Sequence, residues 1–174
     1  MTPTQPPAGE LEGLLTEVEA ALSASLYYMA VVLALMIPDI CGALASADGV
    51  SSGLKYKNWY NANLASQYPS LSAHDCYKLR CGVVHQGRLG HPDMQYSRVL
   101  FTLPNAQNNH YHNNIVQGAL NLDAACFCRD VTDAARRWYA AHHNDSSVRV
   151  NLPHLVRFRP EGISPYMVGM PLIA

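Results

Sequence analysis

The chain has little charge: 14% of its 174 residues are Asp, Glu, Lys or Arg, whereas 49% are apolar. Disordered segments have the opposite balance, so this composition predicts one globular domain with a sizeable buried core. The net charge of −1 gives no reason for the molecule as a whole to bind nucleic acid. Phosphate affinity needs clustered Lys and Arg, so any contact with RNA has to come from a local patch.

CxxC pairs are missing among the five cysteines, which are Cys41, Cys76, Cys81, Cys126 and Cys128. Their absence argues against a zinc ribbon or a thioredoxin-type site. On a helix, Cys126 and Cys128 would point roughly 200° apart and could not chelate a metal together. We therefore expect reduced, mostly buried thiols in a cytoplasmic protein, with no metal and no cofactor.

Basic residues are absent before Lys55, although residues 20–38 are uncharged and long enough to raise the question of a membrane span. A signal peptide needs a basic start, and a spanning helix usually has basic cytoplasmic flanks. Here the upstream flank is Glu17 and Glu19. The sequence therefore favours a buried bundle helix over a membrane helix, and we expect no membrane association.

The spacing of apolar residues predicts a mainly α-helical fold, a helical bundle. Residues 10–37 follow a helical repeat, which Pro38 is expected to kink or break. Further helices are expected at 56–68, from Ser70 or Ser72 to Gly87, and over 118–143. Alternating residues at 99–103 and 112–117 predict a small β-hairpin, at about 97–117, inserted before the last helix.

Three segments follow from this pattern. Residues 1–9, with three prolines, are expected to be a disordered leader, and residues 10–145 to be the helical domain. Residues 146–174 are expected to be a C-terminal extension packed on that domain. This tail is rich in coil and contains a short strand candidate at 155–159.

Arg80 and His85 together provide a permanent cation and a side chain that carries protons near neutral pH. A cation for the phosphate and a proton carrier beside it are the minimum needed to cut RNA without a metal. A structural interpretation is also open: Arg80 would form surface ion pairs, and His85 would stabilise the helix C-terminus.

Spacing alone does not single out this pair. Arg137 precedes His142 and His143 at a similar distance and is a competing candidate, and Arg149 precedes His154. The last match contains a proline, which interrupts a helix.

The string Leu79-Arg80-x-x-Val83-Val84-His85-x-Gly87 resembles the signature of the HEPN domain superfamily, small helical bundles found in many bacterial ribonuclease toxins and defence proteins. The resemblance is specific over residues 71–88 and architectural over the rest of 10–145. It implies a metal-independent endoribonuclease, acting as a toxin or defence effector, that cleaves RNA through attack by the ribose 2′-OH. His85 would be the general base or acid, and Arg80 would stabilise the phosphorane. The implied partners are RNA, a second copy in a homodimer, and an antitoxin or regulatory protein.

Two positions differ from the family pattern. Cys81 stands where Asn, Asp or His usually follows the arginine, and Gly87 stands where some toxins carry a tyrosine. Cys81 and the near-neutral net charge favour the alternative, a non-catalytic HEPN-like module that binds a nucleotide, RNA or a protein partner.

Supporting roles are expected for Asp39 and Lys78. Asp39 either caps the helix that resumes after Pro38 or reaches the motif to orient His85. Lys78 either widens the positive field of Arg80 or is simply exposed. At ideal geometry Arg80 and His85 stand roughly 140° apart on the helix, so we expect them to flank a cleft.

Three arginines in the tail, Arg149, Arg157 and Arg159, are RNA-contact candidates, or else belong to a solvated edge. His110 and His112 would share one face of a strand, as a metal site requires. No third ligand is evident nearby, so we predict no metal.

Overall fold

The computed structural model describes residues 9–105 and 111–174, and its fold is mainly α, as predicted. The predicted leader, residues 1–9, lies outside the described residues except for Gly9. The helices are α1 (Glu10–Ser23), α2 (Tyr27–Leu44), α3 (Gly53–Asn63), α4 (Ala73–Gln86), α5 (Ala124–His142), α6 (Ser146–Asn151) and the 3-10 helix η1 (Leu152–His154). The strands are β1 (Arg98–Thr102), β2 (Asn114–Val116), β3 (Ala119–Asp123), β4 (Phe158–Arg159), β5 (Gly162–Ile163), β6 (Met167–Val168) and β7 (Leu172–Ile173).

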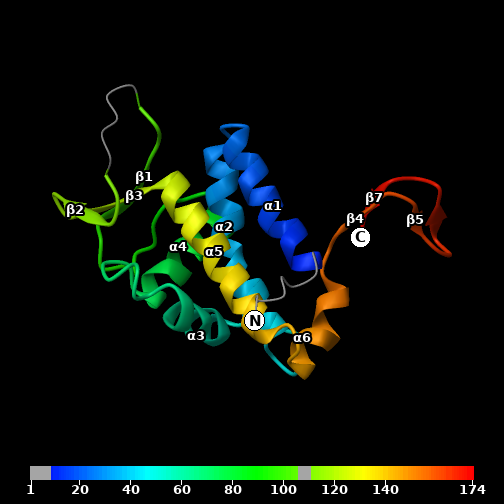
Figure 1. The fold of residues 1–174 in the computed structure, drawn as a ribbon. Coiled ribbons are helices and arrows are strands. Elements are labelled where there is room, and N and C mark those ends of the chain that lie inside the picture. The colour runs from blue at the N-terminus through cyan, green and yellow to red at the C-terminus, as the bar shows by residue number, and fades with distance from the viewer. Residues whose placement is uncertain (1–8, 106–110) are drawn as a thin grey trace, which may run out of the picture.

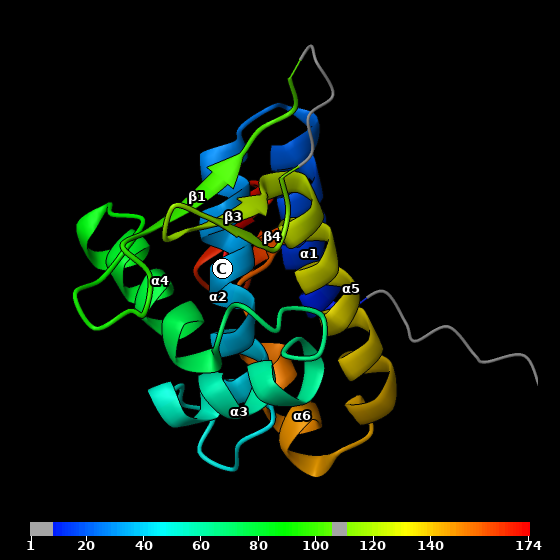
Figure 2. The same ribbon diagram turned by 90° about the vertical axis from the view of Figure 1, so that its left-hand side faces the viewer.

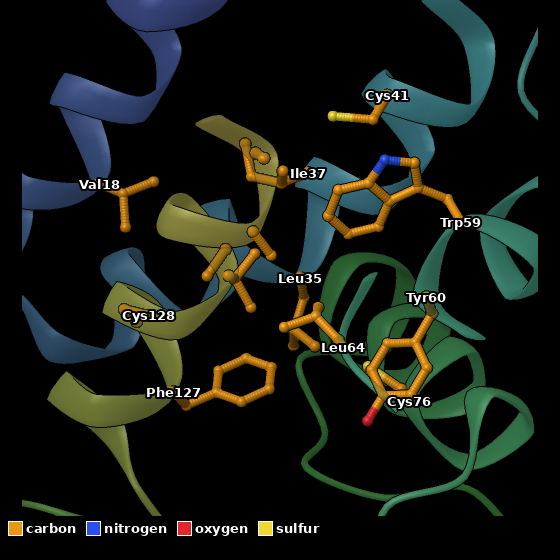
Figure 3. Packing of buried hydrophobic residues seen from close by; sticks show 14 of the residues in the cluster. Val18, Leu35, Ile37, Cys41, Trp59, Tyr60, Leu64, Cys76, Phe127 and Cys128 are labelled. Atoms are coloured by element: carbon orange, nitrogen blue, oxygen red, sulfur yellow. The ribbon is translucent and has the colours of Figure 1, made fainter. Parts of the chain in front are cut away.

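Helix α2 is the centre of the bundle and packs against α1, α3, α4, α5 and α6 (Figures 1 and 2). Its apolar residues leave no polar face, which suits a helix surrounded by others. Figure 3 shows Val18 of α1, Leu35 of α2 and Phe127 of α5 meeting in one core. All three are at most 1% exposed.

Residues 10–37 do not form one helix, so that prediction is wrong at residues 24–26. Ser25 takes a left-handed conformation (φ 58°), and the chain reverses so that α1 and α2 pack as a helical hairpin. Both arms of the hairpin are apolar, and a turn this short leaves no gap in the hydrophobic pattern.

Pro38 does not break α2, which continues to Leu44. Proline removes one backbone donor, so the carbonyl of Ala34 loses its usual helical partner. The proline is buried among the neighbouring helices, and tertiary packing keeps the helix continuous. Asp39 consequently lies inside α2 and not at a helix start.

Among the described helices, α2 alone is long and apolar enough to cross a membrane. However, 56% of its residues are buried inside the protein. The core helix of a soluble protein has the same length and composition, so these two properties are weak grounds for a span.

The predicted hairpin at about 97–117 is wrong in its pairing. β3 lies between β1 and β2: it runs parallel to β1, with Arg98 opposite Ala119, and antiparallel to β2. The tight turn between β2 and β3 has positive φ at Gln117 and Gly118, as hairpin turns require.

The last long helix therefore starts later than residue 118. Asp123 ends β3 and caps α5, because its Oδ1 accepts the backbone N–H of Cys126 at 2.8 Å.

The first part of the C-terminal extension packs on the domain, and further along Arg157 forms an ion pair with Glu10 of α1. Val148 is buried, and Asn151 donates its side-chain N–H to the carbonyl of Ser46 at 2.8 Å. From residue 156 onward the tail projects on the side of the bundle opposite α4, where it forms two short two-stranded ladders (Figure 1). Its side chains are largely solvated: Tyr166 is 85% exposed and Ile173 is 76% exposed.

Candidate functional site

Helix α4 carries the motif and has the predicted bounds. The Ser72 hydroxyl oxygen accepts the backbone N–H of Asp75 at 3.0 Å and caps the start of the helix. Gly87, with φ 63°, ends it in the left-handed conformation that favours glycine. Figure 2 shows α4 beside α2, the helix that supplies the next member of the site.

Arg80 and His85 are in contact. Nη1 of Arg80 lies 3.2 Å from Nε2 of His85, although the helix shows no bulge between them. We expected the 140° offset to keep them on two sides of a cleft, and that expectation is wrong because the long guanidinium arm reaches around the helix. Arginine can only donate, so Nε2 of His85 is the acceptor in this contact.

Asp39 forms an ion pair with the other edge of the guanidinium, although the two facing atoms lack the geometry of a hydrogen bond. Its Oδ2 lies 2.6 Å from Nε of Arg80, and its Oδ1 accepts the hydroxyl of Ser51 at 2.5 Å. The predicted helix-cap role of Asp39 is wrong. The carboxylate, 8% exposed, instead stands behind Arg80, which in turn contacts His85.

The charge state of Arg80 is secure in this position. Partial burial lowers its pKa, but the Asp39 carboxylate and contacts with Cys81 more than offset that effect. The net pKa is above the ordinary arginine value, so the site always contains this cation.

Tyr77 and Cys81 complete the surroundings of Arg80 on α4. A hydrogen bond with Cys81 raises the pKa of Tyr77, and desolvation adds to the effect. The Tyr77 ring packs against Gly53, where a Cβ would come within 2.8 Å of Cζ. The half-buried Cys81 is therefore engaged at the edge of the site and does not face solvent freely.

Residues 88–96, which we call the strap, fold back along α4. A Cβ on Gly82 would lie 2.5 Å from the carbonyl oxygen of Gly90, so only glycine allows this close approach. The buried carboxylate of Asp75 accepts the backbone N–H of Gln95 at 3.1 Å and its side-chain amide at 2.8 Å. The strap is thus fixed against the motif helix at both ends.

Lys78 is engaged by the strap. Its Nζ lies 2.7 Å from Oδ2 of Asp93, and this hydrogen bond raises the pKa of Lys78. Its charge is therefore paired and adds little to the field of Arg80.

Sequence reasoning missed two residues near the site. Ser51 lies in a loop twelve residues from Asp39, and no local pattern indicated their contact. Arg88 follows the motif directly and is exposed. In residues 9–105 and 111–174 it has no carboxylate partner, so it is an unpaired cation beside the C-terminus of α4.

The three RNA-contact candidates are not brought to this site. Arg157 forms an ion pair with Glu10, and Arg159 contacts the terminal carbonyl of Ala174 at 3.4 Å. The tail that carries Arg157 and Arg159 lies across the bundle from α4 (Figure 1). Arg149 is exposed on α6, next to the projecting tail.

The competing Arg–His match at the end of α5 makes other contacts. His142 is bound through Nδ1 to Asp145 at 2.8 Å and stacks on Trp138, whereas Arg137 is exposed. In the part of the chain that the structure describes, Arg137 makes no contact with His142 or His143 like that of Arg80 with His85.

The two histidines considered for a metal do not form a site within the described chain. Nδ1 of His112 accepts the backbone N–H of Asp123 at 3.0 Å, and His110 lies outside the described residues. Among the residues that the structure describes, no group of three or more His, Cys, Asp or Glu side chains could hold a metal ion.

Comparison of the chain with protein-family models, curated proteins and solved structures gives no match. The HEPN resemblance stays a prediction based on the motif, and the function has to be argued from the site itself.

Proposed function

We propose that the chain is a metal-independent endoribonuclease of HEPN type, working in the cytoplasm. The observation that carries this proposal is the contact of Arg80 with His85 at 3.2 Å, held from behind by Asp39. A fixed cation and an imidazole within one hydrogen bond of each other are the groups that cleavage through a 2′-OH requires.

The resting contact suggests how substrate would start the reaction. Phosphate oxygens are stronger acceptors for a guanidinium than an imidazole nitrogen is. A bound phosphodiester would therefore take the Nη1 donor of Arg80 and release the lone pair on Nε2 of His85. The base would become free only when a phosphate is in place.

In the reaction, Nε2 of His85 takes the proton of the ribose 2′-OH, and the 2′-oxygen attacks phosphorus. Arg80 stabilises the charge that builds on the phosphorane oxygens. The bond to the 5′-oxygen breaks, and that oxygen takes a proton from an acid. The products are a 2′,3′-cyclic phosphate and a 5′-OH end, with no metal or cofactor used.

Asp39 and Ser51 act as positioning residues in this proposal. The guanidinium is planar, and a carboxylate behind Nε limits its rotation so that the Nη atoms face the phosphate. Ser51 in turn fixes the carboxylate by donating to Oδ1.

The acid that protonates the 5′-oxygen comes from the second subunit of a homodimer. In this dimer the two Arg80/His85 pairs face each other across a shared cleft. One His85, unprotonated at Nε2, would then be the base, the other, protonated at Nε2 as an imidazolium, would be the acid, and two arginines would hold the phosphate. An antitoxin or regulatory protein would act by covering this cleft. Light scattering at micromolar concentration tests the dimer, and a monomer would contradict it.

The second candidate is a non-catalytic HEPN-like module that binds nucleotide, RNA or a protein. The pairing of charges around the motif favours it, because Asp39 pairs with Arg80 and Asp93 pairs with Lys78. A neutralised surface attracts RNA weakly.

Incubation of the purified protein with total RNA separates the two candidates. The wild type and a His74→Ala control, changed at an exposed position on the same helix, should cleave, whereas His85→Ala should not. Equal cleavage by His85→Ala and the wild type would refute the nuclease. Binding of RNA without cleavage by the wild type would favour the second candidate.

A further inference from the structure

A cavity of about 650 Å³ adjoins the site through Asp39. It lies between the C-terminal half of α2, the loop at 48–51 and the segment that contains α6 and η1. Asp39 and Ser51 line it, together with the apolar side chains of Ala43, Leu44 and Leu155. Cavities that hold small ligands span about 300–1,000 Å³, so its volume suits a nucleoside.

The wall of this cavity is preformed. The side-chain amide of Asn151 donates to the carbonyls of Leu44 and Ser46, at 3.2 and 2.8 Å, and so closes the end of α2. Gly49, with φ 64°, packs on the same amide, where a Cβ would come within 2.8 Å of Oδ1. Contacts between distant parts of the chain therefore shape the cavity without any ligand.

The two carboxylates in the cavity are each paired with a cation. Asp39 faces Arg80, and Asp48 accepts from Lys55 at 2.5 Å. Oδ1 of Asp48 also accepts from Ser46 and Val50, and Oδ1 of Asp39 from Ser51. Oδ2 of Asp48 is left as a carboxylate acceptor, in a cavity that His154 also lines and whose carboxylates are charge-paired. Such surroundings suit a neutral ligand that donates hydrogen bonds and has an apolar body.

We propose that this cavity binds one unstacked nucleobase of single-stranded RNA, next to the phosphate held by Arg80, and that it favours bases bearing an amino group over uracil. Single-stranded RNA is read by splaying bases out of the strand, and carboxylates accept hydrogen bonds from amino groups such as N4 of cytosine. The proposal rests on the proposed function, because Asp39 both lines the cavity and pairs with Arg80.

The test uses single-stranded 2′-O-methyl hexamers of cytosine or uracil, which cannot be cleaved, with binding followed by fluorescence anisotropy. The wild type should bind the cytosine hexamer about tenfold more tightly than the uracil hexamer. Ala43→Phe should lose this preference because the ring fills the cavity, whereas Ala140→Phe, on the exposed face of α5, should keep it.

Leu155→Trp fills the cavity from its opposite wall and provides a second variant if Ala43→Phe does not fold. Equal binding of the two hexamers by the wild type would overturn the proposed base site. A cytosine preference that remains in both Ala43→Phe and Leu155→Trp would overturn it as well. The results distinguish the cavity proposal from the proposed nuclease activity. RNA cleavage without base preference overturns the cavity proposal alone. Base preference in a protein that cleaves no RNA supports the cavity and refutes the nuclease.

Discussion

Arg80 Nη1 and His85 Nε2 lie 3.2 Å apart, although the two residues are five positions apart on a regular helix. Both residues belong to one chain, and they hydrogen-bond to each other when no substrate is present. In the proposed mechanism, a bound phosphate opens this contact. This relationship is the basis of the predictions that involve catalysis.

Arg80→Lys should lower RNA cleavage by about 10²–10³-fold, the cost of losing one donor to the transition state. A lysine ammonium is a point charge on a flexible stem and cannot pair with Asp39 while also binding a phosphate through a fixed fork of donors. Single-turnover cleavage rates measure the effect. Lys78→Arg is the control, since its charge is paired with Asp93 and is preserved; an equal loss there would point to a general effect of substitution on α4 and contradict the role given to Arg80.

Asp39→Ala should destabilise the fold by about 2 kcal/mol, because it leaves Arg80 with an unpaired charge in a largely buried position. The cost is below that of a fully buried pair, since the Arg80 side chain remains 20% exposed. Urea denaturation measures it. Asp48→Ala breaks an ion pair on an exposed loop, and its midpoint should move far less. Equal midpoints for the two variants would contradict the role given to Asp39.

Gly82→Ala should destabilise the protein by about 1–3 kcal/mol. The added Cβ meets the carbonyl oxygens of Gly90 and Arg88, both of which belong to backbone that cannot rotate away. Gly13→Ala is the matched control in α1, where a Cβ meets nothing within 4 Å, and it should stabilise the helix by about 0.5–1 kcal/mol. Thermal unfolding of both variants tests the strap, and two shifts of the same sign would count against it.

Stability should fall at alkaline pH because of buried thiols. Burial raises the pKa of Cys76 and of Cys128 from 9.0 to about 12. Below pH 9 both thiols are protonated in the folded and the unfolded chain, so their contribution is constant. Between pH 9 and 12 the unfolded chain loses these protons first, and the free energy of unfolding decreases. Urea midpoints across this range measure the slope, which Cys76→Ala should reduce; an unchanged slope would contradict the assignment.

Local signals predicted the motif helix well. Ser72 and Gly87 bound α4 because a capping hydroxyl and a left-handed glycine act through neighbouring backbone groups, which sequence patterns record. The turn at Ser25 escaped prediction because the apolar pattern continues on both sides of it.

Long-range pairing explains the remaining differences. β3 is a strand because β1 and β2 flank it, and nothing within residues 119–123 opposes a helix. The contact of Asp39 with Arg80 joins α2 to α4, and that of Asp39 with Ser51 depends on the loop after α2. Such contacts depend on packing between elements, so no periodicity in the sequence indicates them.

The central claim is that His85 removes the proton of a ribose 2′-OH beside a phosphate held by Arg80. The most direct test is mass spectrometry of the product ends after a defined single-stranded RNA is incubated with the protein in EDTA. The account predicts a 2′,3′-cyclic phosphate and a 5′-OH for the wild type, and uncut RNA for His85→Ala. Products with 5′-phosphate ends, or cyclic ends formed equally by His85→Ala, would contradict it.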